Sequence, residues 1–205
     1  MSDTQNMIKS VDNNNEKYLS YKENIKRYNK AKISEFYFEC IWILYAMIED
    51  RTSAFLYYLG FTSENKRNSV TGCKKIKHQV RQILNMKNDE KYKFDSLFGK
   101  LSRIEQLVAW SSEDLYDIYP YQKDIKYIIK KILEDESFIK SIRYLNNEWR
   151  NKRNQLMHAL FNKKYDEAIE ELKPLVENGY NAVRKIDSSV KQLKKAEIRK
   201  KYKIR

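Results

Sequence analysis

The stretch FYFECIWILYAMIEDR, residues 36–51, contains the longest apolar run of this 205-residue chain. The run includes Glu39 and is followed directly by the charged residues Glu49, Asp50 and Arg51. A helix that spans a bilayer needs about 20 predominantly apolar residues, so this stretch is too short and too charged to cross a membrane. We therefore expect it to form the central, buried helix of a water-soluble protein.

Glycine and proline are scarce in the chain, with four and two residues respectively. Sandwiches, barrels and doubly wound sheets need frequent turns, and these two residues are the usual markers of turns. We therefore predict an all-α fold, a helical bundle of about five to seven helices. A chain of this length can bury a sizeable core as one domain, so residues 1–205 are expected to form a single domain.

Hydrophobic periodicity and cap residues predict where the helices begin and end. Ser34 is the predicted N-cap of the apolar helix, and Gly60 is its predicted C-terminal stop. Residues 1–12 are polar and precede the first helix. The last helix begins near Tyr165, can be interrupted at Pro174 or Gly179, and continues into the C-terminal tail. The other predicted helices cover about residues 15–30, 35–59, 74–86, 94–110, 121–133 and 138–162.

The two cysteines, Cys40 and Cys73, do not have the spacing of a known motif. A disulfide framework is therefore not expected, and a reducing compartment fits the chain better. The first residues, MSDTQNMIKS, lack the charged-then-apolar pattern of a secretory signal. These observations together predict a cytoplasmic protein.

Positive charge is concentrated at the C-terminus of the chain. The formal net charge is +13, and residues 184–205 contain ten Lys and Arg against Asp187 and Glu197, which gives 10 − 2 = +8. Such a balance favours a polyanionic partner, with nucleic acid as the first candidate and an anionic membrane surface as the second. A solvated helix end that only keeps the protein soluble explains the tail equally well.

The stretch WRNKRNQLMHALF, residues 149–161, holds one of the two histidines of the chain, His158. With a rotation of about 100° per residue, one side of this helix forms an apolar stripe made of Leu145, Trp149, Leu156 and Leu160. A sector on the far side, about 100° wide, holds Arg150, Asn151, Asn154 and His158. His158 is thus predicted to point away from the core, and Arg153 flanks the polar sector.

This set of side chains suits the cleavage of RNA without a metal. The ribose 2′-hydroxyl attacks the neighbouring phosphorus, and histidine can transfer the proton at neutral pH. Arginine offers a rigid fork of donors to phosphate oxygens, and asparagine can hold the phosphate or orient the imidazole. The set lacks a nucleophile beside the base, a carboxylate pair and an oxygen-ligand cluster for a metal. We therefore expect no cofactor and no metal.

The hexapeptide from Arg153 to His158, RNQLMH, follows the pattern R-N-x-x-x-H and resembles the signature of HEPN-domain ribonucleases. That signature is an arginine, a polar residue that is often asparagine, and a histidine a few residues further on. The context agrees with the resemblance, because the motif lies on a late helix of an all-α chain, with LNNEW before it and ALF after it. The resemblance covers about residues 15–185, and the motif helix is its diagnostic part.

The resemblance implies a function and a set of partners. HEPN domains are helical bundles that commonly form homodimers, in which two motif helices meet at a composite active site. Active members cleave RNA without metal, often leave a cyclic phosphate, and many serve in bacterial defence or with an antitoxin or other regulatory protein. By position, Arg153 would stabilise the phosphate, Asn154 would orient it and His158 would transfer protons. The helical projection adds Arg150 and Asn151 as substrate-binding residues.

Two features of the motif qualify the resemblance. One HEPN subgroup has a tyrosine two residues after the motif histidine, where an antitoxin modifies it; Leu160 occupies that position here, which excludes this modification. Tyr165 is close enough to keep the general idea open. Arg153 and His158 are five residues apart and do not share one face of a helix. Their cooperation is easier across a two-fold interface between subunits.

Other features leave alternatives open. Glu49 and Asp50 either pair locally where the apolar helix reaches solvent, or orient Arg153 or His158 from a neighbouring helix. His78, in KKIKHQVRQ, is expected at the surface. Two other functions compete with the ribonuclease. The first is an inactive HEPN-like module that binds a nucleotide, nucleic acid or a partner protein, and the second is a basic scaffold that tethers nucleic acid.

Overall fold

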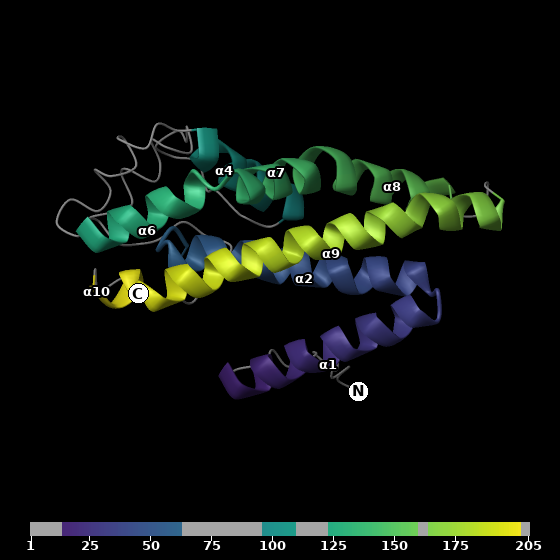
Figure 1. Ribbon diagram of the computed structural model, residues 1–205, viewed down its shortest axis with the longest axis horizontal. Coiled ribbons are helices and arrows are strands. Elements are labelled where there is room, and N and C mark those ends of the chain that lie inside the picture. Colours follow the sequence, from purple (N-terminus) through teal and green to yellow (C-terminus); the bar gives the residue numbers. More distant parts are fainter. Residues whose placement is uncertain (1–13, 63–95, 110–122, 160–163, 202–205) are drawn as a thin grey trace, which may run out of the picture.

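The computed structural model describes residues 14–62, 96–109, 123–159 and 164–201, and within these ranges it contains helices and no β-strand. The all-α bundle predicted from the sequence is therefore confirmed (Figure 1). The predicted helix at 74–86, Cys73, His78 and the predicted loop at 111–119 lie outside the described residues. The helical elements are α1 (Asn14–Ile33), α2 (Tyr37–Tyr58), α4 (Leu97–Ala109), α6 (Lys123–Leu133), α7 (Glu136–Arg143), the π-helix η1 (Tyr144–Trp149), α8 (Arg150–Ala159), α9 (Tyr165–Lys195) and α10 (Ile198–Lys201).

The apolar helix α2 is the centre of the bundle, as the sequence predicts. It runs beside α9 in the same direction, α1 crosses below both, and the run from α6 through α8 lies above them in the opposite direction (Figure 1). Its buried residues include Cys40, Leu44, Ile48, Phe55 and Leu56. No helix in the described part of the chain has both the length and the apolar character needed to cross a membrane.

The two ends of α2 differ in how well the sequence predicted them. At the C-terminal end Gly60 has a φ of 81°, and the N–H of Phe61 donates to the carbonyl oxygen of Leu56 (3.0 Å). This is the arrangement of a Schellman motif, so the predicted glycine stop is confirmed. At the N-terminal end the predicted cap Ser34 is wrong. Its N–H donates to Lys30 and ends α1, and α2 begins after Phe36.

The predicted motif helix at 138–162 begins at Glu136 and contains a π-helical segment. Asp135 caps the start of α7 by accepting from the N–H groups of Ser137 (2.9 Å) and Phe138 (3.2 Å). In η1 the wider π turn places both Leu145 and Asn146 inside the bundle. Such segments often occur at functional sites in helices.

Trp149, the last residue of η1, is locked against α9. Its Nε1 donates to the carbonyl oxygen of Leu175 (3.0 Å), and its side chain is fully buried. A Cβ atom at Gly179 would lie 2.5 Å from this Nε1. Glycine at this position therefore allows the close approach of the two helices. It does not interrupt α9, which also continues through Pro174.

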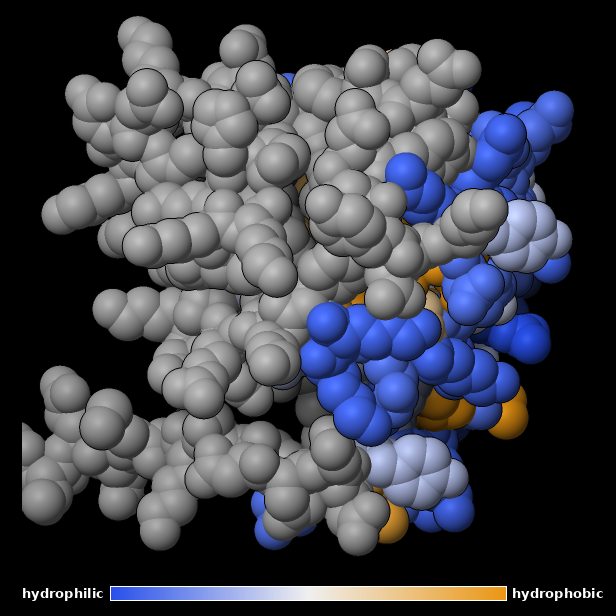
Figure 2. All heavy atoms as spheres, turned by 90° about the vertical axis from the view of Figure 1, so that its left-hand side faces the viewer, coloured by the Kyte–Doolittle hydropathy of each residue, from blue (hydrophilic) through white to orange (hydrophobic). Residues whose placement is uncertain are grey.

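The basic C-terminal region is part of the folded bundle as far as residue 201. Leu193 and Ile198 are almost completely buried, and Arg199 donates to the carbonyl oxygens of Tyr57 (3.2 Å) and Thr62 (2.8 Å) at the end of α2. Viewed from the end at α6 and α10, the described residues present a mainly hydrophilic surface (Figure 2). Removal of residues 190–205 would thus remove core side chains together with the positive charge.

Candidate functional site around α8

Helix α8 lies at the surface of the bundle with one side turned inward. Leu156 is buried, together with Leu145 and Trp149 of the preceding segment, so three members of the predicted apolar stripe lie in the core. The fourth, Leu160, lies outside the described residues. The polar side of α8 divides into two groups, because Asn151 and His158 are exposed whereas Arg150, Arg153 and Asn154 are partly buried.

Arg153 is held between α8 and α2. Its guanidinium carbon lies 4.5 Å from the centroid of the Tyr45 ring on α2, within the range of a cation–π interaction. One guanidinium nitrogen, Nη2, donates to Oδ1 of Asn154 (2.6 Å). The Nε atom is buried and has no hydrogen-bond partner within the part of the chain that the structure describes. The side chain is therefore fixed in position but not fully satisfied.

Arg150, one turn earlier, has a similar environment on the other side. Its guanidinium carbon lies 4.2 Å from the centroid of the Phe98 ring at the start of α4. Its Nε donates to the carbonyl oxygen of Asn146 in the π segment (3.1 Å). The helical projection placed Arg150 fully on the far side of the helix. The structure instead places the side chain of Arg150 on the side of α8 that faces α4, because its guanidinium group lies over the Phe98 ring.

Asn146 is a buried polar residue one helical turn before Arg150, and the sequence analysis did not identify it. It is 5% exposed, and its Nδ2 donates to Oε2 of Glu105 on α4 (2.7 Å). Its Oδ1 is buried and has no hydrogen-bond partner among the described residues. Because the π turn faces Asn146 inward, this amide links the position of Arg150 to α4.

His158 and Asn151 are directed toward solvent. His158 has no hydrogen-bond partner in the described ranges, and Asn151 donates from Nδ2 to the carbonyl oxygen of Asn147 (2.7 Å). Within one chain the structure gives no hydrogen bond between His158 and Arg153 or Asn154. The predicted catalytic residues thus lie on one helix, and only Arg153 and Asn154 are brought into contact.

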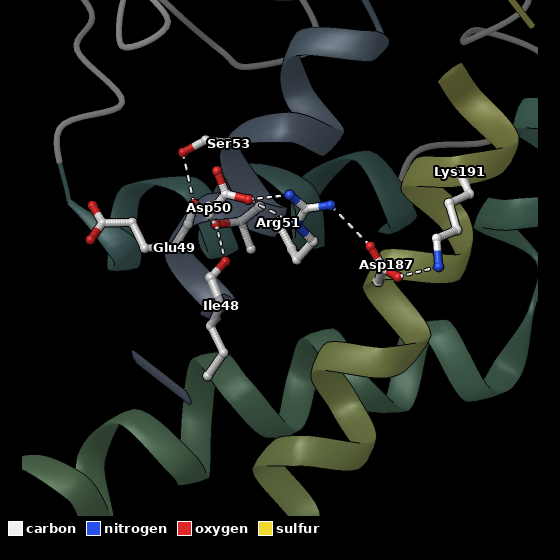
Figure 3. A network of polar contacts seen from close by, with 8 residues as sticks. Ile48, Glu49, Asp50, Arg51, Ser53, Asp187 and Lys191 are labelled. Atoms are coloured by element: carbon white, nitrogen blue, oxygen red, sulfur yellow. Dashed lines mark hydrogen bonds and ion pairs between the residues drawn. The ribbon is translucent and has the colours of Figure 1, made fainter. Parts of the chain in front are cut away.

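Glu49 and Asp50 bind cations other than those they were expected to orient. Glu49 accepts from Nζ of Lys100 on α4 (3.0 Å), and Asp50 accepts from its neighbour Arg51. Arg51 also donates to Asp187 on α9 (3.0 Å) (Figure 3). Asp50 thus pairs locally with Arg51, whereas Glu49 pairs with a lysine of another helix, and neither of these pairs includes Arg153 or His158.

The two arginines of α8 are held by aromatic rings and amides. No carboxylate lies within ion-pair distance of Arg150 or Arg153 among the described residues. Arginines without such counter-charges can attract an anion, and their planar forks fit phosphate oxygens. In the described ranges, no three His, Cys, Asp or Glu residues lie close enough together to hold a metal ion. The arrangement is therefore suited to holding a phosphate.

The basic end of the bundle lies far from this site. Leu175, which contacts Trp149, is separated from the exposed Lys194 by 194 − 175 = 19 residues of α9. At 1.5 Å per residue this corresponds to about 28 Å along the helix. The basic C-terminal region therefore lies too far from α8 to contact it.

Tyr45 and Phe98, like Asn146, are site residues that the sequence analysis missed. Tyr45 and Phe98 belong to segments that were predicted to be helical, but neither was identified as a site residue. A usable signal exists only for Tyr45, which lies on one stripe of α2 with Trp42 and Glu49, beside the most buried positions.

Comparison of the chain with protein-family models, curated proteins and solved structures gave no match. The HEPN resemblance therefore rests on the residues of α8 and on the all-α fold alone.

Proposed function

We propose that the protein is a metal-independent endoribonuclease of the HEPN type that cleaves single-stranded RNA in the cytoplasm. One observation supports this proposal above the others. Arg150 and Arg153 are held on aromatic rings at the edge of α8, without a carboxylate partner among the described residues, and His158 is exposed on the same helix. A phosphate and a proton-transfer group can thus meet at one surface.

In the proposed reaction the ribose 2′-oxygen bonds to phosphorus while the bond from phosphorus to the 5′-oxygen of the next nucleotide breaks. A proton leaves the 2′-hydroxyl and a proton is delivered to the departing 5′-oxygen. The products are a 2′,3′-cyclic phosphate and a 5′-hydroxyl. His158 transfers a proton. Arg153 stabilises the charge that develops on the phosphate oxygens, and Asn154 keeps its fork in position.

A second copy of the chain completes this proposed site. An in-line displacement needs proton transfer at opposite ends of the phosphorus, and one imidazole does not reach both ends. Within one chain, moreover, His158 does not contact Arg153. A homodimer in which two α8 helices face each other would supply a base from one subunit and an acid from the other. An antitoxin or other regulatory protein would act by covering this face.

The proposal is tested with labelled single-stranded RNA in the presence of EDTA. We expect wild-type protein to cut the RNA and to leave a 2′,3′-cyclic end, and we expect His158→Ala to cut slower by about 10²-fold or more while it still binds. Gln155→Ala, an exposed residue of the same helix, is the matched control and should cut normally. RNA with 2′-deoxy substitution at the cleavage position should remain intact.

Two outcomes would contradict the proposal. If wild-type protein binds RNA but leaves it intact, the protein is not a ribonuclease, and one of the two binding alternatives is correct. If His158→Ala cuts as fast as the wild type, the assignment of His158 as the catalytic residue is wrong.

A further inference from the structure

Trp42 is an exposed aromatic residue on the most buried helix of the protein. Its side chain is 58% exposed, whereas Ile41 and Ile43 beside it are buried. Single exposed apolar side chains are common on protein surfaces, so the position of Trp42 is informative only through the residues beside it.

Trp42 lies on the side of α2 that faces the site. It precedes Tyr45 by three residues, so the two side chains are neighbours with Cβ atoms about 5–6 Å apart. Tyr45 is the residue whose ring supports Arg153. The exposed indole therefore stands next to the aromatic support of the proposed phosphate-binding arginine.

The carboxylates on this stripe of α2 are paired with cations. Arg27 of α1 donates to Glu39, and Lys100 of α4 donates to Glu49. Arg153, beside Tyr45, has no carboxylate partner among the described residues, so at this point an anionic chain is attracted rather than an uncharged peptide.

We propose that Trp42 is a base-stacking platform that receives an unpaired base of single-stranded RNA when a neighbouring phosphate lies on Arg153. The inference rests on the proposed function and deepens it, because it assigns the residue that recognises a base next to the cleaved phosphate. Stacking on an aromatic ring accepts every base, since every base has a π face. The platform selects unpaired RNA, whose bases are free to stack, over duplex RNA.

The test measures binding of a labelled single-stranded oligouridine to full-length protein with the His158→Ala substitution, so that cleavage does not intervene. Trp42→Ala should raise Kd by about 5- to 160-fold, the range of one lost stacking contact. Trp42→Phe should stay close to the parent protein because it keeps an aromatic face. Tyr18→Ala, an exposed aromatic residue at 65% on α1, is the matched control and should leave Kd unchanged.

A second probe separates stacking from a general effect on binding. The same oligonucleotide with abasic sugars keeps its phosphates, so Trp42→Ala should bind it as well as the parent protein does. Equal weakening for both probes, or no weakening for either, would overturn the proposal. If Trp42→Ala instead converts a dimer into a monomer in a mass measurement, the indole belongs to an interface between copies of the chain, and the stacking role is wrong.

The outcome is distinguishable from failure of the proposed function. If the wild type does not cut RNA but the base-dependent effect of Trp42 is present, the stacking platform stands and the ribonuclease fails. If the wild type cuts in EDTA but Trp42→Ala binds both probes like the parent, only the platform fails.

Discussion

Arg51 and Arg153 are both arginines on helices of the same bundle, and both lie over a tyrosine ring. The guanidinium carbon of Arg51 lies 4.6 Å from the centroid of Tyr21, and that of Arg153 lies 4.5 Å from the centroid of Tyr45. The rings are alike and so are the distances. The difference between the two residues lies in the groups that face the charge.

Arg51 is enclosed by carboxylates. It donates to Asp50 and to Asp187 (3.0 Å), and Lys191 donates to the second oxygen of Asp187 (2.7 Å) (Figure 3). Burial opposes the positive charge, but the carboxylates outweigh it, and the pKa of Arg51 is raised above its ordinary value. This network joins α1, α2 and α9, so the charge of Arg51 stabilises the packing of three helices.

Arg153 is fixed by a ring and by the amide of Asn154, without a carboxylate among the described residues. Its charge therefore remains available to an incoming anion. The contrast suggests a criterion for chains of this kind. An arginine that is ordered but not neutralised is a better candidate for binding phosphate than one that is ordered by carboxylates. Three substitutions test this distinction, taken in the order of their effect on the free energy of unfolding.

Arg51→Met should have the largest effect. It leaves Asp187 largely buried, with a side chain 16% exposed, beside Asp50 and without the arginine. The loss of stability should be about 3 kcal/mol, because Arg51 donates to two partly buried carboxylates and Asp187 keeps the exposed Lys191 as its remaining cation. Urea unfolding measures this loss. The folded fraction should still bind RNA with unchanged Kd, and a reduced affinity there would contradict the separation of the two arginines.

Arg153→Met should have the opposite profile. Loss of the interaction with the Tyr45 ring costs at most about 1 kcal/mol of stability, whereas loss of charge stabilisation at the phosphate should slow RNA cleavage by about 10²–10³-fold. Urea unfolding and cleavage rates on the same preparation measure both. A loss of stability as large as that of Arg51→Met, with cleavage unaffected in the folded protein, would make Arg153 a structural residue.

The fold is well predicted by the sequence where local patterns determine it. The apolar run at 36–48 predicts a central helix because its length and composition allow little else, and Gly60 predicts the end of that helix because the motif needs a positive φ. Ser34 fails as a cap because α1 continues to Ile33 and the N–H of Ser34 belongs to its last turn. The chain then turns at Glu35, with a φ of 58°, before α2 begins at Tyr37. The π segment is not predictable from periodicity, because periodicity assumes the same rotation per residue along the whole helix.

The candidate site is predicted only in part, for the same reason. Periodicity within one helix correctly predicts that His158 is exposed and that Leu156 is buried. It does not predict which rings support the arginines, because the contacts of Arg153 with Tyr45 and of Arg150 with Phe98 join segments far apart in sequence. Such contacts are set by the packing angles of three helices rather than by any local pattern.

Lys185→Met should have the smallest effect on the free energy of unfolding. It tests how much an ion pair contributes when its side chains are not buried. Lys185 donates to Asp135 (2.8 Å), but both side chains are about one-third exposed. Solvent weakens such a pair, so the expected loss of stability is about 0.5 kcal/mol.

The pKa of Asp135 is lowered by hydrogen bonds from Lys185 and then from Ser137. A carboxyl with a depressed pKa in the folded state stabilises the protein above its unfolded pKa and loses this contribution as the pH falls through the folded value. The stability difference between wild type and Lys185→Met should therefore be largest near neutral pH and shrink below about pH 4. Urea unfolding at several pH values measures it. If Lys185→Met lowered the free energy of unfolding as much as Arg51→Met, a partly exposed ion pair would stabilise the protein as much as a buried one. Burial would then not explain the structural role of Arg51, and only its carboxylate partners would distinguish it from Arg153.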